Sequence, residues 1–155
     1  MTGVQTCALP IWTPEITAKF STTHSNKCWR NCGPHIGNQT HILWLCPKLE
    51  AFWKEVFETL NKIFDGNITM DPMVALLGLL PRGMEGRAKK YLLQILLATA
   101  IKCITVRWLK PDPPTHNMWT EKIKEIYQME QITYSLRLQK HIFTKRWSPA
   151  MGILI

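Results

Sequence analysis

Three cysteines and one histidine are the residues of this chain best suited to chemistry. Cys28, Cys32, His41 and Cys46 follow the spacing Cys-x3-Cys-x8-His-x4-Cys. Thiolates and imidazoles are preferred ligands of Zn²⁺, and four of them close a tetrahedral shell with no position left for water. The spacing therefore predicts a structural zinc site, which supplies roughly 10–16 kcal/mol to a segment too small to fold alone.

The residues between these ligands allow the chain to fold back on itself. Gly-Pro at 33–34 and Gly-Asn at 37–38 are turn-forming pairs. Two other imidazoles, those of His24 and His35, are alternatives to the predicted histidine ligand. In the competing interpretation no metal is bound, and the cysteines are reduced, partly buried thiols beside a loop histidine.

Basic residues gather in two groups. The sequence has 19 Lys+Arg against 11 Asp+Glu, a formal net charge of +8. One group lies at 82–90, and the other lies in a stretch without acids between Gln131 and Trp147. Such groups neutralise phosphates while neighbouring rings stack on unpaired bases, so we predict binding of RNA or single-stranded DNA. The predicted contact residues are Trp29, Arg30, Arg87, Lys89, Lys90, Arg137, Lys140, Lys145 and Arg146. The alternative is a solvated basic face with its aromatic residues buried beneath it.

No catalytic arrangement accompanies these groups in the sequence. His116 and His141 have no nucleophile and acid at a suggestive spacing. Cys103 lies in an apolar stretch, and we expect it to be a small core residue. The sequence therefore favours a protein that is not an enzyme.

Helical periodicity predicts the elements that position these residues. Hydrophobic residues make up 46% and charged residues 19% of the 155 positions, which is typical of a folded domain. Apolar side chains at three- and four-residue steps predict a helix of about 17 residues that starts at Pro47 and stops at 65–67. Further helices are predicted at 72–79, at 85–109 and at 115–143. The Pro-rich stretch at 110–114 breaks the chain before the last of these, Thr115 can cap it, and it continues or kinks toward its end.

The apolar stretch at 91–109 approaches the length of a bilayer span, but it contains Gln94, Lys102 and Arg107. Charges at mid-membrane are costly, so we expect a buried central helix and no membrane contact. No export signal is visible. We therefore expect an intracellular protein of the cytoplasm or nucleus, not secreted, whose cysteines form no disulfides.

The expected fold is all-α, with a small zinc-knuckle-like Cys3His segment followed by a three- to four-helix bundle. Residues 4–11 resemble translated sequencing-adapter DNA, so we expect an artefactual leader and a missing natural N-terminus. The expected parts are the leader at 1–12, a linker at 13–27, the Cys/His segment at 28–46, the helical domain at 47–149 and a tail at 150–155.

Several blocks of the sequence resemble one family. They are CWRNCG at 28–33, THILWLCPKL at 40–49, FWKEVF at 52–57, MVALLGLL at 73–80 and RWSP at 146–149. In order and spacing they resemble the C-terminal segment of reverse transcriptases of non-LTR retrotransposons, of the long interspersed element type found in fish and amphibians. The resemblance covers nearly all of 26–149. The commoner family pattern has seven residues between the second cysteine and the histidine, where this sequence has eight.

The resemblance implies a non-catalytic module that assists RNA or target-DNA binding in target-primed reverse transcription. It places the family's cysteine motif on Cys28, Cys32, His41 and Cys46, and it implies a partner in the upstream polymerase domain of the parent protein. The family's endonuclease and polymerase domains lie upstream of this segment. Two alternatives stay open: a structural module that packs on the polymerase domain, and a relic fragment with no activity.

Overall fold

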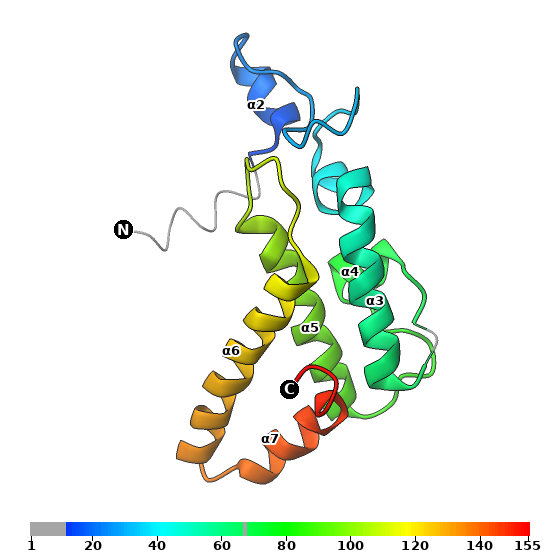
Figure 1. The fold of residues 1–155 in the computed structure, drawn as a ribbon, viewed down its shortest axis with the longest axis vertical. Coiled ribbons are helices and arrows are strands. Elements are labelled where there is room, and N and C mark those ends of the chain that lie inside the picture. Colours follow the sequence, from blue (N-terminus) through cyan, green and yellow to red (C-terminus); the bar gives the residue numbers. More distant parts are fainter. Residues whose placement is uncertain (1–11, 67) are drawn as a thin grey trace. The chain divides into compact units, whose positions relative to one another are not determined.

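The computed structural model describes residues 12–66 and 68–155, and these residues are organised by helices (Figure 1). Within them the only β pairing is one isolated antiparallel bridge between Lys27 and Ile36. The prediction of an all-α fold, with a Cys3His cluster ahead of the long helices, is confirmed for this part of the chain. The predicted leader lies outside the described residues, apart from Trp12.

The chain forms two compact units. One consists of the described residues up to Phe52 together with Ile101–Pro114, and the other consists of Trp53–Ala100 together with Thr115–Ile155. The first unit contains the cysteine segment, and the second contains both basic groups. Residues 101–114 lie within the helical domain expected at 47–149, so this return of the chain to the first unit is a feature that periodicity alone does not indicate.

Short helices position the cysteine segment in the first unit. Helix α2, Pro14–Phe20, lies where the sequence suggested a linker, and Thr13 caps it by accepting a hydrogen bond from the backbone N–H of Ile16. A π-helical turn, His41–Leu45, and a 3-10 turn, Pro47–Leu49, follow the cysteine-containing loop.

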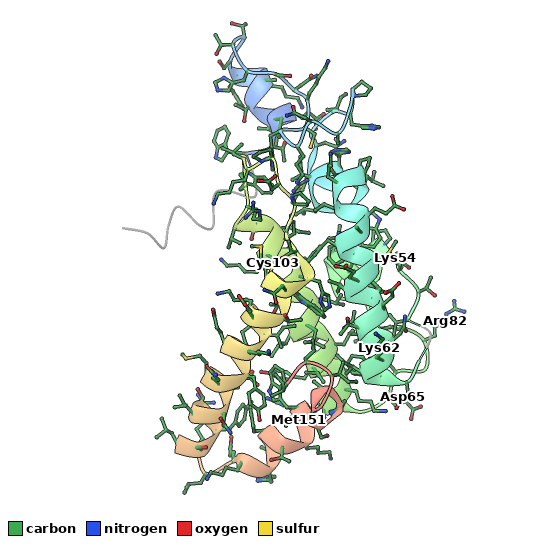
Figure 2. The ribbon with its side chains drawn as sticks, in the orientation of Figure 1. Lys54, Lys62, Asp65, Arg82, Cys103 and Met151 are labelled. Carbon is green, nitrogen blue, oxygen red and sulfur yellow. The ribbon has the colours of Figure 1, made fainter. Side chains whose placement is uncertain are left out.

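Helix α3, Glu50–Phe64, follows the 3-10 turn directly. Its apolar face is buried, and that face consists of Phe52, Trp53, Val56, Phe57, Leu60 and Ile63. Lys54 and Lys62, about two turns apart on this helix, are exposed (Figure 2). The predicted helix thus begins as a 3-10 turn, and Pro47 stands at its first position, where the missing N–H costs no hydrogen bond.

The second unit contains the remaining helices. They are α4, Pro72–Leu77, α5, Arg87–Thr105, α6, His116–Leu136, and α7, Lys140–Trp147, followed by a 3-10 turn, Ser148–Ala150. Helix α5 begins in this unit, and its last residues belong to the first. Thr115 caps α6 as predicted, accepting a hydrogen bond from the N–H of Met118 at 3.2 Å. The helix predicted at 115–143 is interrupted at 137–139, where Leu138 adopts a positive φ of 56°. Helix α7 follows this break and runs in a different direction from α6 (Figure 1).

Helices α6 and α7 contribute large aromatic and aliphatic side chains to the core of the second unit. Trp119 and Ile123 of α6 are fully buried, and the Trp119 Nε1–H donates to the backbone oxygen of Leu96 at 3.0 Å. Phe143 and Trp147 of α7 are also buried. In the part of the chain that the structure describes, no helix combines the length and the apolar character needed to cross a membrane.

Candidate functional site

The four predicted metal ligands lie together in the first unit. The sulfur atoms of Cys28, Cys32 and Cys46 and a ring nitrogen of His41 all lie within 4.8 Å of one another. Cys32 Sγ lies 3.2 Å from His41 Nε2. Ligands on one tetrahedral Zn²⁺ lie about 3.5–3.8 Å apart, so a contraction of about 1 Å brings the widest pair to coordination distance. The cluster is therefore a Cys3His group able to hold a metal ion.

A tight turn presents the first two cysteines. The bridge between Lys27 and Ile36 closes this turn, and the N–H of Cys28 donates to the His35 oxygen at 3.1 Å. Gly33, immediately after Cys32, has a φ of +120° that side chains rarely allow. The turn therefore depends on glycine at this position to bring the two thiols together.

The π-helical turn positions the other two ligands. The N–H of Cys46 donates to the His41 oxygen at 2.9 Å, so the two ligands stand at the two ends of one wide turn. The side-chain oxygen of Asn38 accepts from the N–H of His41 at 2.8 Å and fixes where the turn begins. The five-residue step explains the x4 spacing of the motif, which an α-helical turn does not match.

Burial disfavours the charged forms of three side chains of the cluster. Burial raises the pKa of the Cys28 thiol, and burial together with hydrogen bonds from its neighbouring thiols raises the pKa of Cys32 to about 12. Burial also lowers the pKa of His41 and keeps its ring neutral. A divalent cation would supply the positive charge that thiolates need here, and its uptake would release protons.

The alternative histidines do not join the cluster. His24 is exposed and bonds to the hydroxyl groups of Ser21 and Thr23. The ring of His35 stacks on that of His41, with ring centroids 5.3 Å apart, and its residue is exposed. The structure thus places His41 among the thiols, while the His35 ring stacks on the His41 ring from outside the cluster.

Arg30 lies inside the first unit, which corrects its expected role. It is 2% exposed and donates from Nη1 to the backbone oxygen of Ile42 at 2.9 Å. A phosphate has no access to Arg30 in this position, so we assign it to the interior. Trp29 is half-buried, and its ring packs on Trp108 with centroids 4.8 Å apart. Periodicity did not indicate this pairing, because Trp108 comes from the distant segment Ile101–Pro114.

The two basic groups meet at one groove of the second unit. The groove has a volume of about 600 Å³ and lies where the start of α5 approaches α7. Its cationic lining comes from Arg87, Lys89, Lys145 and Arg146, and His141 lies beside them. Apolar groups complete the lining, which includes Ala88, Ile142 and Pro149, and Glu85 is its one acid. Residues far apart in the sequence thus form one positively charged surface.

Three other predicted contact residues lie outside this groove. Lys90 is half-buried, and Arg137 and Lys140 are exposed near the turn between α6 and α7. The aromatic residues beside these basic groups are interior, since Trp147 is 1% and Phe143 is 8% exposed. Base stacking on these two rings is therefore excluded in this conformation.

A polar network holds Arg146 in place, and sequence reasoning missed it. The guanidinium carbon lies 3.7 Å from the centre of the Tyr91 ring, and Nη1 donates to the Tyr134 hydroxyl. The Tyr91 hydroxyl and the Trp147 Nε1–H both donate to the carboxylate of Glu130. Burial and the bond to Glu130 raise the pKa of Tyr91. The only sequence signal was a single acid on a face of α6 that is otherwise lined by tyrosines.

Comparison with known families adds nothing to this geometry, since no family model matches the sequence. Among the described residues, Cys103 is the cysteine outside the Cys3His group, and it is buried as expected of a core residue.

Proposed function

We propose that the chain is a non-catalytic module that binds RNA or single-stranded DNA and is stabilised by one zinc ion. The single observation that carries this proposal is the convergence of Arg87, Lys89, Lys145 and Arg146 on one groove. Together with the sequence resemblance, it supports a role in holding RNA or target DNA for the reverse transcriptase of a non-LTR retrotransposon.

Electrostatics favours a polyanionic ligand at this groove. The lining contains four side chains of lysine and arginine and one carboxylate, that of Glu85, so its charge is predominantly positive. Arg87 and Lys89 also stand in the first turn of α5, at the positive end of the helix dipole, where acids are normally favoured. This accumulation of like charge is costly in the free protein, and phosphate groups relieve it. Contacts of this kind are independent of sequence, so we expect tolerant binding.

Zinc is the metal that the donor set of the first unit fits best. Three soft thiolates and one imidazole form the donor set of closed structural zinc sites. Cys28, Cys32, His41 and Cys46 would hold the ion, and the ion would stabilise the turn and the π-helical segment that carry them. With four protein ligands the site leaves no position for a substrate, so its contribution is to folding.

Binding is tested with the full chain and a labelled single-stranded RNA at low salt. The variant Arg87→Ala/Lys145→Ala removes two charges from the groove and should weaken binding by about tenfold or more. The matched control Lys54→Ala/Lys62→Ala removes two charges from the exposed side of α3, away from the groove lining (Figure 2). It should weaken binding by less than about twofold. Absence of binding to RNA and single-stranded DNA at low salt would refute the proposal.

The zinc assignment is tested by metal analysis of the purified chain. We expect one zinc per chain, lost in Cys46→Ser and retained in Cys103→Ala, whose thiol lies outside the cluster (Figure 2). A chain that contains no zinc and folds unchanged in chelator contradicts the assignment.

A second candidate function is favoured by exposed apolar residues in one segment of the second unit. These residues are Met70, Met73, Leu77, Leu79 and Leu80, each at least 37% exposed. Such a concentration is typical of a protein contact, which here would be the upstream polymerase domain of the parent protein. Leu77→Asp should abolish retention on that domain while leaving RNA affinity unchanged if this surface serves docking.

A further inference from the structure

We propose that the basic groove holds one unpaired nucleotide of a single strand, with its phosphate on Arg146 and Lys145 and its base against Ile142 and Pro149. This inference deepens the proposed function and rests on it. It specifies the form of nucleic acid that the groove selects, where the proposed function specifies only a polyanionic partner.

The size and lining of the groove carry the first part of the argument. A volume of about 600 Å³ falls within the roughly 300–1,000 Å³ of sites that enclose small ligands. A surface that serves only the outer phosphates of a duplex gains nothing from depth. Here the cationic side chains surround apolar ones, namely Ala88, Ile142 and Pro149. That combination suits a nucleotide, which joins a charged phosphate to a flat apolar base.

The state of Arg146 carries the second part. Its guanidinium is held on the Tyr91 ring and by the Tyr134 hydroxyl. The nearby carboxylate of Glu130 is engaged by the Tyr91 hydroxyl and the Trp147 Nε1–H instead. In residues 12–66 and 68–155, Arg146 forms no ion pair. Arg146 is thus a positioned cation with most of its N–H donors available, which is the arrangement that binds phosphate by a planar fork.

Base pairing decides which strand can use both parts of the groove. In a duplex the bases are stacked and paired, so only phosphates reach a concave protein surface. In a single strand a base can turn outward, and proteins that bind such strands combine charged grooves with surfaces for the base. Since Phe143 and Trp147 are buried, the base surface in this protein is aliphatic, and Ile142 is its half-buried centre.

The test compares strands with the full chain. Fluorescence anisotropy is measured at one low salt concentration with oligothymidylate, with oligouridylate and with a blunt duplex of equal length. Contact of one base with the apolar lining should make the single strands bind about tenfold more tightly than the duplex.

Two variants separate the phosphate contact from the base contact. Arg146→Lys keeps the charge but loses the planar fork, and it should weaken single-strand binding by about tenfold. Ile142→Ser removes an apolar side chain from the lining without changing the charge. It should reduce the ratio of single-strand affinity to duplex affinity toward one. Lys62→Ala is the matched control on α3, and it should leave the preference unchanged. Circular dichroism and thermal melting of each variant establish that it folds.

The outcomes distinguish this inference from the proposed function. Equal affinity for single strands and duplex, or an unchanged preference in folded Ile142→Ser, overturns the inference while the proposed function stands. No binding to any of the three probes overturns both. Tighter binding of single strands that both variants reduce supports the inference.

Discussion

The salt dependence of binding follows from the four lysine and arginine side chains of the basic groove. Each phosphate that such a side chain neutralises on a single strand contributes a slope of about −0.7 to the plot of log affinity against log salt concentration. With Arg87, Lys89, Lys145 and Arg146 all engaged, the slope should be about −3. A rise from about 50 to about 200 mM salt should then lower affinity about fiftyfold.

The assay is a salt series of anisotropy titrations with a labelled oligouridylate. Lys145→Ala removes one contact, so the slope should become shallower by about 0.7 while affinity at low salt falls. Lys62→Ala removes the same charge from the exposed side of α3, outside the groove lining, and its slope should equal that of the unmodified chain. Comparing the slopes of the two variants separates the effect of a charge in the groove from the effect of the same charge elsewhere on the protein.

Two results would refute this reasoning. A slope near zero means that phosphates are not neutralised by the protein. An equal change in slope for Lys145→Ala and Lys62→Ala means that binding reports the net charge of +8 and not a localised groove.

Three further predictions concern the cluster and the core. Cys32→Ser should prevent binding of one zinc per chain and lower the melting temperature of the zinc-loaded protein, as measured by metal analysis and calorimetry. Trp119→Phe should lower the free energy of unfolding by about 1–3 kcal/mol in urea denaturation, because the bond to the Leu96 oxygen and buried ring volume are lost. Tyr91 has a raised pKa, chiefly through burial and then through its bond to Glu130, so the folded state favours the protonated phenol. Its contribution is therefore present below the ordinary pKa of 10.0 and lost as the pH rises above it. The difference in unfolding free energy between the unmodified chain and Tyr91→Phe should accordingly shrink above pH 10, and a constant difference contradicts this.

Helices were predictable because their signals are local. Apolar periodicity indicated α3, the Thr115 cap indicated the start of α6, and the Pro-rich stretch at 111–114 indicated the break before it. Helix α2 was missed although Thr13 followed by a proline and an acid is an N-terminal helix signal. The polar composition of 13–27 suggested a linker and outweighed that short signal.

The Cys3His group was predictable for the same reason, since spacing within one short segment limits where its four side chains can lie. The ring contact of Trp29 was not predictable, because Trp108 comes from a distant part of the chain. The burial of Arg30 was not predictable either, because it depends on how the loop packs on the Ile42 backbone. The groove is another nonlocal feature, formed only when the start of α5 meets α7. Sequence reasoning identified the charges on each side, but no spacing rule joins Arg87 to Lys145.

The first unit consists of two segments that are far apart in the sequence, and this affects the order in which its parts are synthesised. All four residues of the Cys3His group precede Ile101–Pro114 in the chain and are therefore synthesised first. At a synthesis rate of about 5–20 residues per second, the segment Ile101–Pro114 is completed about 3–12 s after Phe52. Until then Trp29 has no Trp108 to pack against. A metal ion bound early would stabilise the loop that carries Trp29 before Trp108 is synthesised.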